Sequence, residues 1–256
     1  FFASLRRIIM NKTAIIIPSR LDAQRLPNKP LKLIKNKEMI LHVYEAAIKS
    51  NNGNVYVATP DQKLFDLIKN IGGNVVKTSN DHLTGTDRVF EVFQKSLNSE
   101  PDIVVNLQGD MPNISPKAIN KLIEYMKKNK CDIATLGSDL KYPKDLSNPN
   151  IVKVAVNEKL TEEKFVESAD FFRTNKSSTL NLYHHIGIYA FTKEALIRYV
   201  ELQRSKLEIE RKLEQLRALE NNMTIHVGYV KASPLSIDTE EDLIKVKELM
   251  ERNEKN

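Results

Sequence analysis

Short runs of β-branched residues alternate with longer amphipathic runs through the first half of the chain, and this alternation is what most restricts its fold. The expected strands are 13–17, 54–59, 74–78, 102–110 (which runs into a turn) and 132–136, and the expected helices are 39–50, 62–73, 86–97 and 115–129. Strands that alternate with helices predict an α/β fold, in which a mostly parallel sheet is flanked by helices on both faces.

Beyond residue 140 the pattern is less regular, and a polar stretch separates the next two strands. Strands are expected at 151–156, 184–191 and 224–230, with helices at 193–202, 206–220 and from about 239. A chain of 256 residues is long enough to bury both halves around one core. We therefore expect one domain over 12–256, with a smaller lobe at about 140–230. We also expect residues 1–11 to be a disordered extension and the charged helix at 206–220 to be a candidate for dimer packing.

Composition excludes several classes of protein. The formal net charge is +6, from 39 basic and 33 acidic residues that are spread along the chain without basic blocks, so nucleic-acid binding is not expected. The single cysteine, Cys131, excludes an intrachain disulfide and a CxxC metal site, and it fits a reducing cytoplasm. No run approaches the ~18 apolar residues that a membrane span requires.

The segment 18–30, PSRLDAQRLPNKP, follows the first predicted strand and carries Arg20, Arg25 and Lys29. Its three prolines prevent one continuous helix. In open α/β sheets, ligands bind outside the carboxyl ends of the strands, which is where this loop leaves the sheet. Neither GxxxxGK[ST] nor GxGxxG occurs in the sequence, so any phosphate site must be of another kind.

Two aspartates are candidates for a metal site beside this loop. Asp110 follows Gly109 in LQGD, at the end of the fourth predicted strand, and Asp238 precedes the last predicted helix. Carboxylates are ligands of Mg²⁺, and basic side chains neutralise phosphate oxygens, so the two features together favour a metal-bound phosphate. The alternatives are a solvated basic loop with a turn aspartate, and a helix N-cap made by Asp238 or Thr239.

Several motifs together resemble the 3-deoxy-manno-octulosonate cytidylyltransferase (CMP-KDO synthetase) family, in order and in approximate spacing. They are AIIIPSRLDAQRLPNKPL, GTDR, NLQGDMP, NPNIVKV, HHIGIYAF, LEQLR and IDTEEDL, and they cover about residues 12–250. RLPxKPL and QGD are typical of the wider nucleotidyltransferase superfamily. HHIGIY, LEQLR and the closing IDTEEDL narrow the resemblance to this family.

The resemblance implies a Rossmann-like nucleotidyltransferase fold, a requirement for Mg²⁺ and a homodimer. It implies transfer of CMP from CTP to the acid sugar KDO, with release of pyrophosphate, for lipopolysaccharide biosynthesis. The catalytic residues implied are Arg20 and Lys29 at the CTP phosphates and Asp110 and Asp238 at the metal. Ser19 and Gln108 are added on the CTP side, with the loop 79–86 completing the cytosine pocket. The positions implied for KDO are Arg88, which suits a carboxylate, and His185, Glu214 and Gln215.

Three positions depart from the family pattern. Met111 stands where glutamate usually follows QGD, Arg211 replaces a second glutamate before LEQLR, and Arg173 is the nearest counterpart of an arginine in a motif that has no clean match. Two alternatives therefore stay open. One is a cytidylyltransferase for another acid sugar such as a sialic acid, and the other is a catalytically silent nucleotide-binding protein.

The remaining single residues receive simpler interpretations. Cys131 is expected at the edge of the core, and His42 and His82 are expected at the surface. For His185, strand packing is the alternative to a substrate contact.

Overall fold

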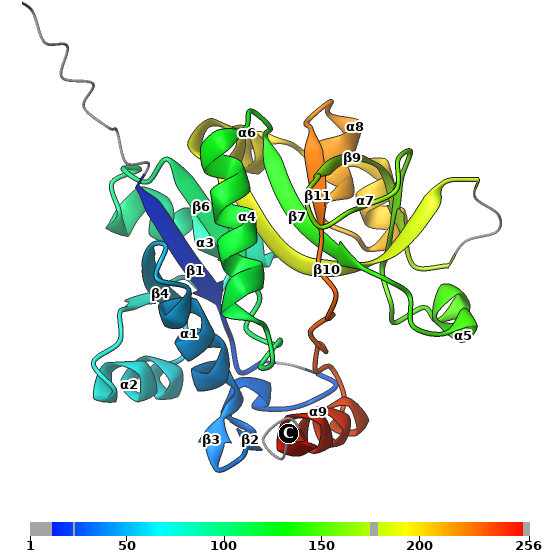
Figure 1. Ribbon diagram of the computed structural model, residues 1–256. Coiled ribbons are helices and arrows are strands. Elements are labelled where there is room, and N and C mark those ends of the chain that lie inside the picture. The colour runs from blue at the N-terminus through cyan, green and yellow to red at the C-terminus, as the bar shows by residue number, and fades with distance from the viewer. Residues whose placement is uncertain (1–11, 23, 175–178, 253–256) are drawn as a thin grey trace, which may run out of the picture.

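The computed structural model describes residues 12–22, 24–174 and 179–252. Its centre is a nine-stranded mixed sheet in the order β5-β4-β1-β6-β10-β7-β11-β9-β8 (Figure 1). The strands are β1 (Thr13–Pro18), β4 (Asn54–Thr59), β5 (Val75–Lys77), β6 (Ile103–Leu107), β7 (Ile133–Ser138), β8 (Lys153–Val156), β9 (Val166–Phe172), β10 (Asn181–Thr192) and β11 (Ile225–Tyr229). A separate small hairpin consists of β2 (Leu33–Ile34) and β3 (Lys37–Glu38).

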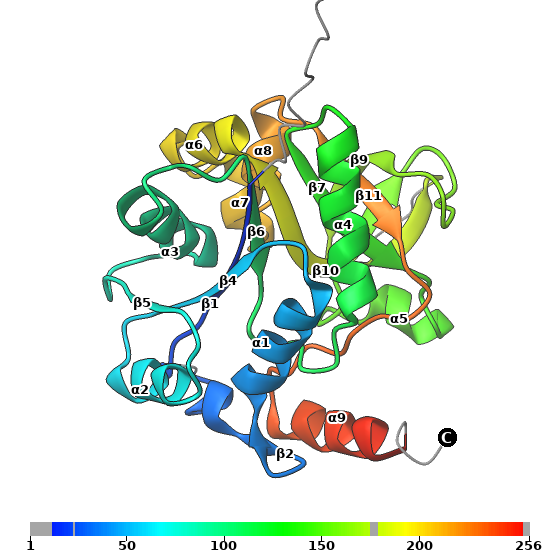
Figure 2. The same ribbon diagram turned by 60° about the vertical axis from the view of Figure 1, so that its left-hand side comes forward.

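Helices cover both faces of the sheet (Figure 2). They are η1 (Lys29–Leu31), α1 (Met39–Ser50), α2 (Gln62–Asn70), α3 (Gly85–Glu91), η2 (Val92–Ser96), α4 (Pro116–Lys128), α5 (Pro143–Ser147), α6 (Lys193–Glu201), α7 (Lys206–Arg211), α8 (Leu216–Glu220) and α9 (Glu240–Arg252). Among the described residues, no helix is both long and apolar enough to cross a membrane.

The apolar run 14–17 lies within strand β1, an interior strand of the sheet. Every one of its residues is buried, because successive side chains point to opposite faces of a sheet that is covered on both sides. Ile15 and Ile17 join the core that α1, α2 and α4 cover, whereas Ala14 and Ile16 join the core beneath α3 and α6. The predicted helix start at Ser115 is present, since the Ser115 side chain accepts a hydrogen bond from the Lys117 amide.

The second half of the chain extends the same sheet rather than building a separate one. β10 lies between β6 and β7 and is antiparallel to both, so the pairing is parallel in the first half and mixed in the second. β9 lies in the stretch that was predicted to be irregular, and it gains its partners from β8 and β11. The predicted disordered extension, 1–11, lies outside the described residues.

The predicted single helix at 206–220 is wrong, because the chain breaks into α7 and α8. Lys212 adopts a left-handed conformation (φ 54°) that ends α7, and the next helix begins only after the buried Leu213 and Gln215. A buried ion pair between Glu208 and Arg217 (2.7 Å) joins the two pieces. The dimer-packing role that we expected for one long helix stays a prediction for the two shorter helices.

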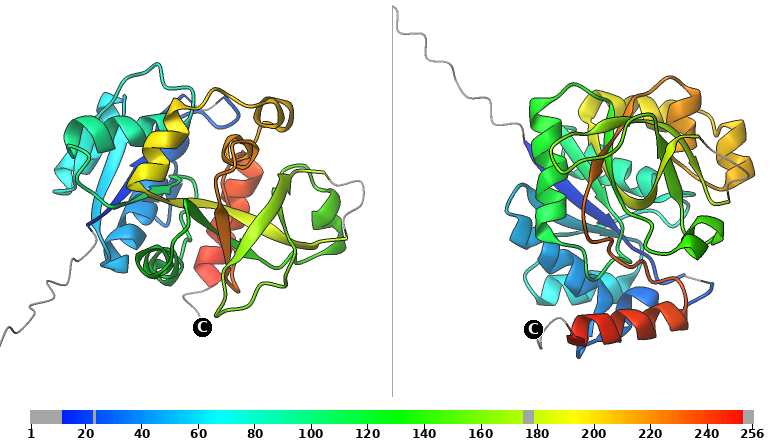
Figure 3. Two further views of the ribbon diagram at one scale, coloured as in Figure 1. Left: turned by 90° about the horizontal axis from the view of Figure 1, so that it is seen from above. Right: turned by 45° about the vertical axis from the view of Figure 1, so that its right-hand side comes forward.

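Helix α9 packs against the basic loop that follows β1 (Figure 3). Leu26 of the loop is buried with Leu243 and Val246 of α9, and Ile237 lies just before that helix in the same cluster. The Ile237 amide also donates to the Asp110 carbonyl (3.0 Å). Helix α9 is thereby fixed beside the ends of β1 and β6.

Candidate functional site

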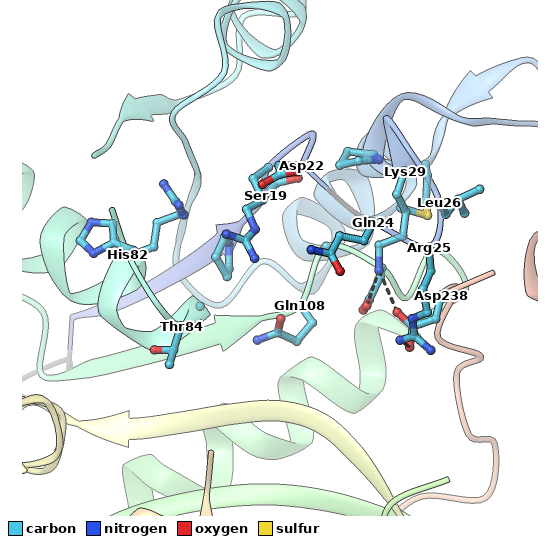
Figure 4. Close-up of a pocket in the computed structure, with 18 of the residues that line it drawn as sticks. Ser19, Asp22, Gln24, Arg25, Leu26, Lys29, His82, Thr84, Gln108 and Asp238 are labelled. Atoms are coloured by element: carbon cyan, nitrogen blue, oxygen red, sulfur yellow. Dashed lines mark hydrogen bonds and ion pairs between the residues drawn. The ribbon is translucent and has the colours of Figure 1, made fainter. Parts of the chain in front are cut away.

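A cavity of about 620 Å³ lies at the carboxyl ends of β1 and β6. It is formed by the basic loop, the segment before α3, the turn after β6 and the residue before α9 (Figure 4). The predicted substrate and metal residues that line it are Ser19, Arg20, Lys29, Arg88, Gln108, Asp110 and Asp238. Asp238 and Lys29 lie at one end, His82 at the other, and Ser19 and Gln108 between them.

The basic loop is held by its backbone. The Ser19 amide donates to the Ala58 carbonyl (2.9 Å), and the Leu21 amide donates to an Asp61 carboxylate oxygen (2.9 Å). Asn28, with φ 55°, reverses the chain before the short helix that carries Lys29. These contacts leave Arg20 exposed in the cavity and direct Lys29 inward. Sequence analysis did not identify Asp61 as the residue that fixes this loop.

Lys29 and the two candidate metal ligands meet at one point. The Lys29 ammonium contacts Asp110 at 3.0 Å and Asp238 at 3.2 Å, as Figure 4 shows. Burial alone lowers the pKa of Lys29, but the two carboxylates outweigh this effect and raise the pKa above its ordinary value. Arg25 contacts the other carboxylate oxygen of Asp238 at 3.0 Å, and no local sequence pattern predicted this ion pair.

The structure shows which residues cap helix α9, and so whether Asp238 is needed as a helix cap. Thr239 accepts a hydrogen bond from the Asp242 amide through Oγ1, and Asp242 accepts from the amides of Asp238 and Thr239. Thr239 and Asp242 are therefore the capping pair. The Asp238 carboxylate takes no part in capping and faces Lys29 and Arg25 instead.

The two carboxylates fit a hard divalent cation by their chemistry. Asp110 and Asp238 supply oxygen donors that already reach one cationic group, the Lys29 ammonium. Within the described ranges, no cluster of three or more His, Cys, Asp or Glu side chains could hold a metal ion. A magnesium ion here would thus take its remaining oxygen ligands from nucleotide phosphates and water, which is usual for Mg²⁺.

Arg88 lies near the predicted phosphate residues. Its guanidinium is buried and donates to the Thr78 hydroxyl (2.5 Å) and to the Ser79 carbonyl (2.8 Å). Burial and the nearby charge of Arg20 lower the pKa of Arg88. Arg88 lines the same cavity as Arg20, whereas His185 does not line it. From this position we expect Arg88 to serve the CTP end, whereas the resemblance implied the KDO carboxylate.

Replacing Arg88 by lysine tests this reassignment. Lysine keeps the charge but loses the planar guanidinium, whose Nη1 atom donates to both Thr78 and Ser79. We expect CTP binding to weaken about ten- to hundredfold, as for a lost hydrogen bond to a charged group, with KDO binding nearly unchanged. Separate titrations of the variant with each ligand would measure this. A loss confined to KDO would restore the original assignment.

The loop before α3 is braced by a histidine that was expected at the surface. His82 lines the cavity and pairs with Glu91 at 2.5 Å, so the prediction of a simple surface group is wrong. Burial raises the pKa of Glu91, but hydrogen bonds from His82, Ser79 and Lys95 outweigh it and lower the pKa to about 2. The loop that was predicted to complete the cytosine pocket is therefore tied to helix α3.

A chain of hydrogen bonds runs from the cavity toward the predicted sugar residues. Gln108 donates to Asn106 (2.9 Å), and the buried Asn106 side chain donates to the Thr86 hydroxyl (3.0 Å). Glu214 lies near that hydroxyl, and burial raises its pKa against the opposing effects of Thr86 and Arg217. Its Oε1 atom is buried and has no hydrogen-bond partner among the described residues.

Tyr199 and Arg217 fix the backbone at Glu214. The Tyr199 hydroxyl donates to its carbonyl (2.9 Å), and the guanidinium of Arg217 lies 4.8 Å from the Tyr199 ring centroid. Gln215 is buried next to Glu214 at the start of α8, and it does not line the cavity. Glu214 does not line the cavity either, but it lies near Thr86, next to the segment that forms the cavity wall.

His185 is buried on β10. Its ring lies 5.0 Å from the Phe171 ring centroid and 5.4 Å from that of Tyr189, and Nε2 is 3.0 Å from the Thr135 hydroxyl oxygen. Burial and the neighbouring His184 lower the pKa of His185 to about 3. The ring is therefore neutral in the fold at neutral pH.

This shift predicts a loss of stability in acid. The unfolded chain takes up a proton on His185 below pH 6.5, whereas the folded chain does so only near pH 3. The stability present above pH 6.5 is thus lost as pH falls, by roughly 1.4 kcal/mol per unit. We expect the free energy of unfolding of His185→Gln to lack the acid-dependent loss that His185 causes. Burial also lowers the pKa values of His184 and His226, and their contributions to the pH dependence are the same in both proteins. Urea unfolding at pH 7, 5.5 and 4.5 measures the difference, and parallel profiles would contradict it.

The three departures from the family pattern have structural partners. Met111 is buried in the core beneath α1 and α4. Arg211 makes two hydrogen bonds to Asp170 (2.7 and 2.8 Å) and one to the Phe171 carbonyl. Arg173 donates to the Pro149 carbonyl (3.1 Å). None of the three lines the cavity.

Comparisons with known proteins agree with one another. A family model described as cytidylyltransferase matches residues 14–225. The 3-deoxy-manno-octulosonate cytidylyltransferase of Brucella ovis is 42% identical over 234 residues, which are 91% of this chain and 93% of that protein. Its counterpart in Brucella anthropi is 40% identical over 241 residues, or 93% of this chain and 96% of that protein.

Solved structures extend the comparison to the backbone. The structure of CMP:2-keto-3-deoxy-manno-octonic acid synthetase complexed with CTP matches with a TM-score of 0.84 and 36% identity, over 94% of this chain and 99% of that chain. A cytidylyltransferase from Leptospira borgpetersenii has a TM-score of 0.63 and 18% identity, over 94% of this chain and 87% of that chain. At that identity the likeness concerns the fold alone.

Proposed function

This chain belongs to the 3-deoxy-manno-octulosonate cytidylyltransferase family, and we propose that it transfers CMP from CTP to KDO and releases pyrophosphate. The observation that carries the proposal is the convergence of Lys29, Asp110 and Asp238 at one end of a cavity that Arg20 also lines. The family comparison favours this reaction over a sialic acid cytidylyltransferase or a silent nucleotide-binding protein.

The proposed reaction is a displacement at the α-phosphorus of CTP. The anomeric hydroxyl oxygen of KDO forms a bond to that phosphorus, while the bond from phosphorus to the bridging oxygen breaks and pyrophosphate leaves. The hydroxyl proton passes to water or to the departing pyrophosphate. In this kind of transfer a protein mainly positions the reactants and stabilises charge. The exposed guanidinium of Arg20 and the Lys29 ammonium are placed to neutralise phosphate oxygens, and no covalent nucleophile is required.

We propose Mg²⁺ as the cofactor, held by Asp110 and Asp238. When bound, such an ion neutralises phosphate charge and lowers the pKa of a hydroxyl that it polarises. Lys29 now lies between both carboxylates, so it would leave them to contact the phosphates. Gln108, which is held by Asn106, is placed between the two ends of the cavity and suits a contact with bound substrate.

At the sugar end we propose Glu214 and His185 as contacts of KDO. Glu214 carries a buried carboxylate oxygen without a partner beside the cavity wall, and a sugar hydroxyl could donate to it. We also propose a homodimer, as the family resemblance implies, and a cytoplasmic location, which the single cysteine fits. Sedimentation across a range of protein concentrations would test the dimer.

The deciding experiment mixes the purified full chain with Mg²⁺, CTP and one acid sugar at a time, and measures pyrophosphate. We expect release with KDO and little with a sialic acid or without sugar. Release only with the sialic acid would favour the other cytidylyltransferase. CTP binding without pyrophosphate for any sugar would favour the silent binding protein.

A further inference from the structure

Strand β10 contains an irregularity beside the proposed sugar site. Its register against β7 shifts between Ile186 and Tyr189, so the segment IGI is bulged. The bulge lies next to a cavity residue, since a Cβ on Gly187 would lie 3.9 Å from the Gln108 side chain. Burial and the nearby charge of Glu214 raise the pKa of Tyr189, the residue after the bulge. Bulges often redirect side chains near active sites.

One hydroxyl of β7 lies inside this bulge. Thr135 Oγ1 is 2.7 Å from the Ile188 carbonyl oxygen, 3.1 Å from the Ile186 carbonyl oxygen and 3.0 Å from His185 Nε2. The Thr135 side chain is fully buried. Its contacts therefore involve the protein alone and can be assigned by counting hydrogens.

The count fixes the direction of the histidine bond. The hydroxyl carries a single hydrogen, and both carbonyl oxygens can only accept. Donation to Ile188, the shorter contact, leaves the Thr135 oxygen free to accept from His185, so His185 carries its hydrogen on Nε2. The reverse assignment, in which Thr135 donates to Nε2, would leave two carbonyl oxygens facing the hydroxyl oxygen without a hydrogen between them. The neutral state of the buried ring agrees with one ring hydrogen.

We propose that Thr135 is a positioning residue that holds His185 in the Nε2–H tautomer and thereby presents Nδ1 as a hydrogen-bond acceptor for a hydroxyl of the acid sugar, an inference that rests on the proposed function. No described residue hydrogen-bonds to Nδ1. Fixing one nitrogen through a partner on the other is the common way in which proteins choose a histidine tautomer.

The first test does not depend on turnover. Nitrogen-15 NMR of histidine-labelled protein distinguishes a protonated from an unprotonated ring nitrogen, and His185→Gln identifies the signals. We expect His185 in wild type to show a protonated Nε2 and an unprotonated Nδ1. Thr135→Val should lose this single form, and Thr135→Ser should keep it. A hydrogen on Nδ1 in wild type would overturn the proposal, whatever the variants do.

The second test is kinetic. We expect Thr135→Val to raise the KM for KDO about three- to tenfold, as for one hydrogen bond, with the KM for CTP within about twofold. Thr135→Ser should restore the wild-type value. Ser138→Ala is the matched control, since it removes a buried hydroxyl of the same strand that has no described partner, and it should change neither constant.

The outcomes separate this inference from the proposed function. If wild type turns over KDO but Thr135→Val leaves its KM unchanged, or harms CTP equally, the inference is wrong and the proposed function stands. If wild type makes no pyrophosphate with KDO, the proposed function is wrong, and the acceptor role of His185 toward this sugar is wrong with it.

Discussion

Replacing Asp110 or Asp238 by asparagine is expected to remove nearly all cytidylyl transfer while the fold survives. Each change neutralises one carboxylate of the proposed metal site without altering its shape. Metal-ion stabilisation of a phosphoryl-type transition state amounts to several kcal/mol, so we expect turnover to fall by about a thousandfold or more. Pyrophosphate release at saturating CTP and KDO measures the loss, and circular dichroism checks the fold.

Glu241→Gln is the matched control for these two variants. It makes the same chemical change in the first turn of α9, but the Glu241 side chain is exposed and pairs with Lys245. We expect its activity to stay within about twofold of wild type, as for an exposed ion pair. Normal turnover in Asp238→Asn would contradict the metal role of Asp238 and leave only its ion pairs with Lys29 and Arg25.

The first half of the fold was predictable because its signals are local. The predicted helix 39–50 and strand 54–59 match α1 and β4 at both ends. Each has its own periodicity, and Gly72, with φ 72°, lies just beyond α2 as a helix-ending glycine does. Sequence reasoning works well where one segment carries both the pattern and its end signal.

The second half depended on contacts between distant segments. β9 has the sequence VESADFF, in which acidic residues interrupt the apolar pattern, and its strand state comes from pairing with β8 and β11. No glycine or proline near Lys212 indicates that the helix ends there. Burial of Leu213 and the Glu208–Arg217 pair outweigh the helix propensity of that segment.

The site residues likewise fall into those that local sequence predicts and those that depend on contacts elsewhere in the fold. Lys29, Gln108 and Asp110 follow strands whose carboxyl ends could be located from sequence, so their meeting at one cavity was predictable. The ion pair of Arg25 and the anchoring carboxylate of Asp61 depend on neighbours far along the chain. The pairing of His82 joins its loop to Glu91, nine residues further on, and no periodic pattern indicated it. Likewise, the expectation that Arg88 serves the CTP end rests on its position beside Arg20, which no local pattern showed.

Lys29→Ala is the second change for which we expect a very large effect. Lys29 is enclosed, with 17% of its side chain exposed, and it reaches both carboxylates, whereas the Lys32 ammonium lies 3.6 Å from Glu240. Loss of one charged group that stabilises a transition state costs about a hundred- to a thousandfold in turnover. Lys32→Ala and Lys35→Ala, which remove charges that do not line the cavity, are expected to stay within about twofold. Equal small losses at all three lysines would mean that the loop is a solvated basic surface.

The position of Lys29 between the carboxylates adds a test that needs no turnover. Removing its ammonium leaves Asp110 without its cationic partner in the described structure and Asp238 with Arg25 alone. Lys29→Ala should therefore melt at a lower temperature than wild type in the absence of divalent cations. Because Lys29 and Mg²⁺ would occupy the same oxygens, adding Mg²⁺ should raise the melting temperature of the variant more than that of wild type. The same increase in both proteins would show that Lys29 and the metal do not compete, and that these carboxylates are not the metal site.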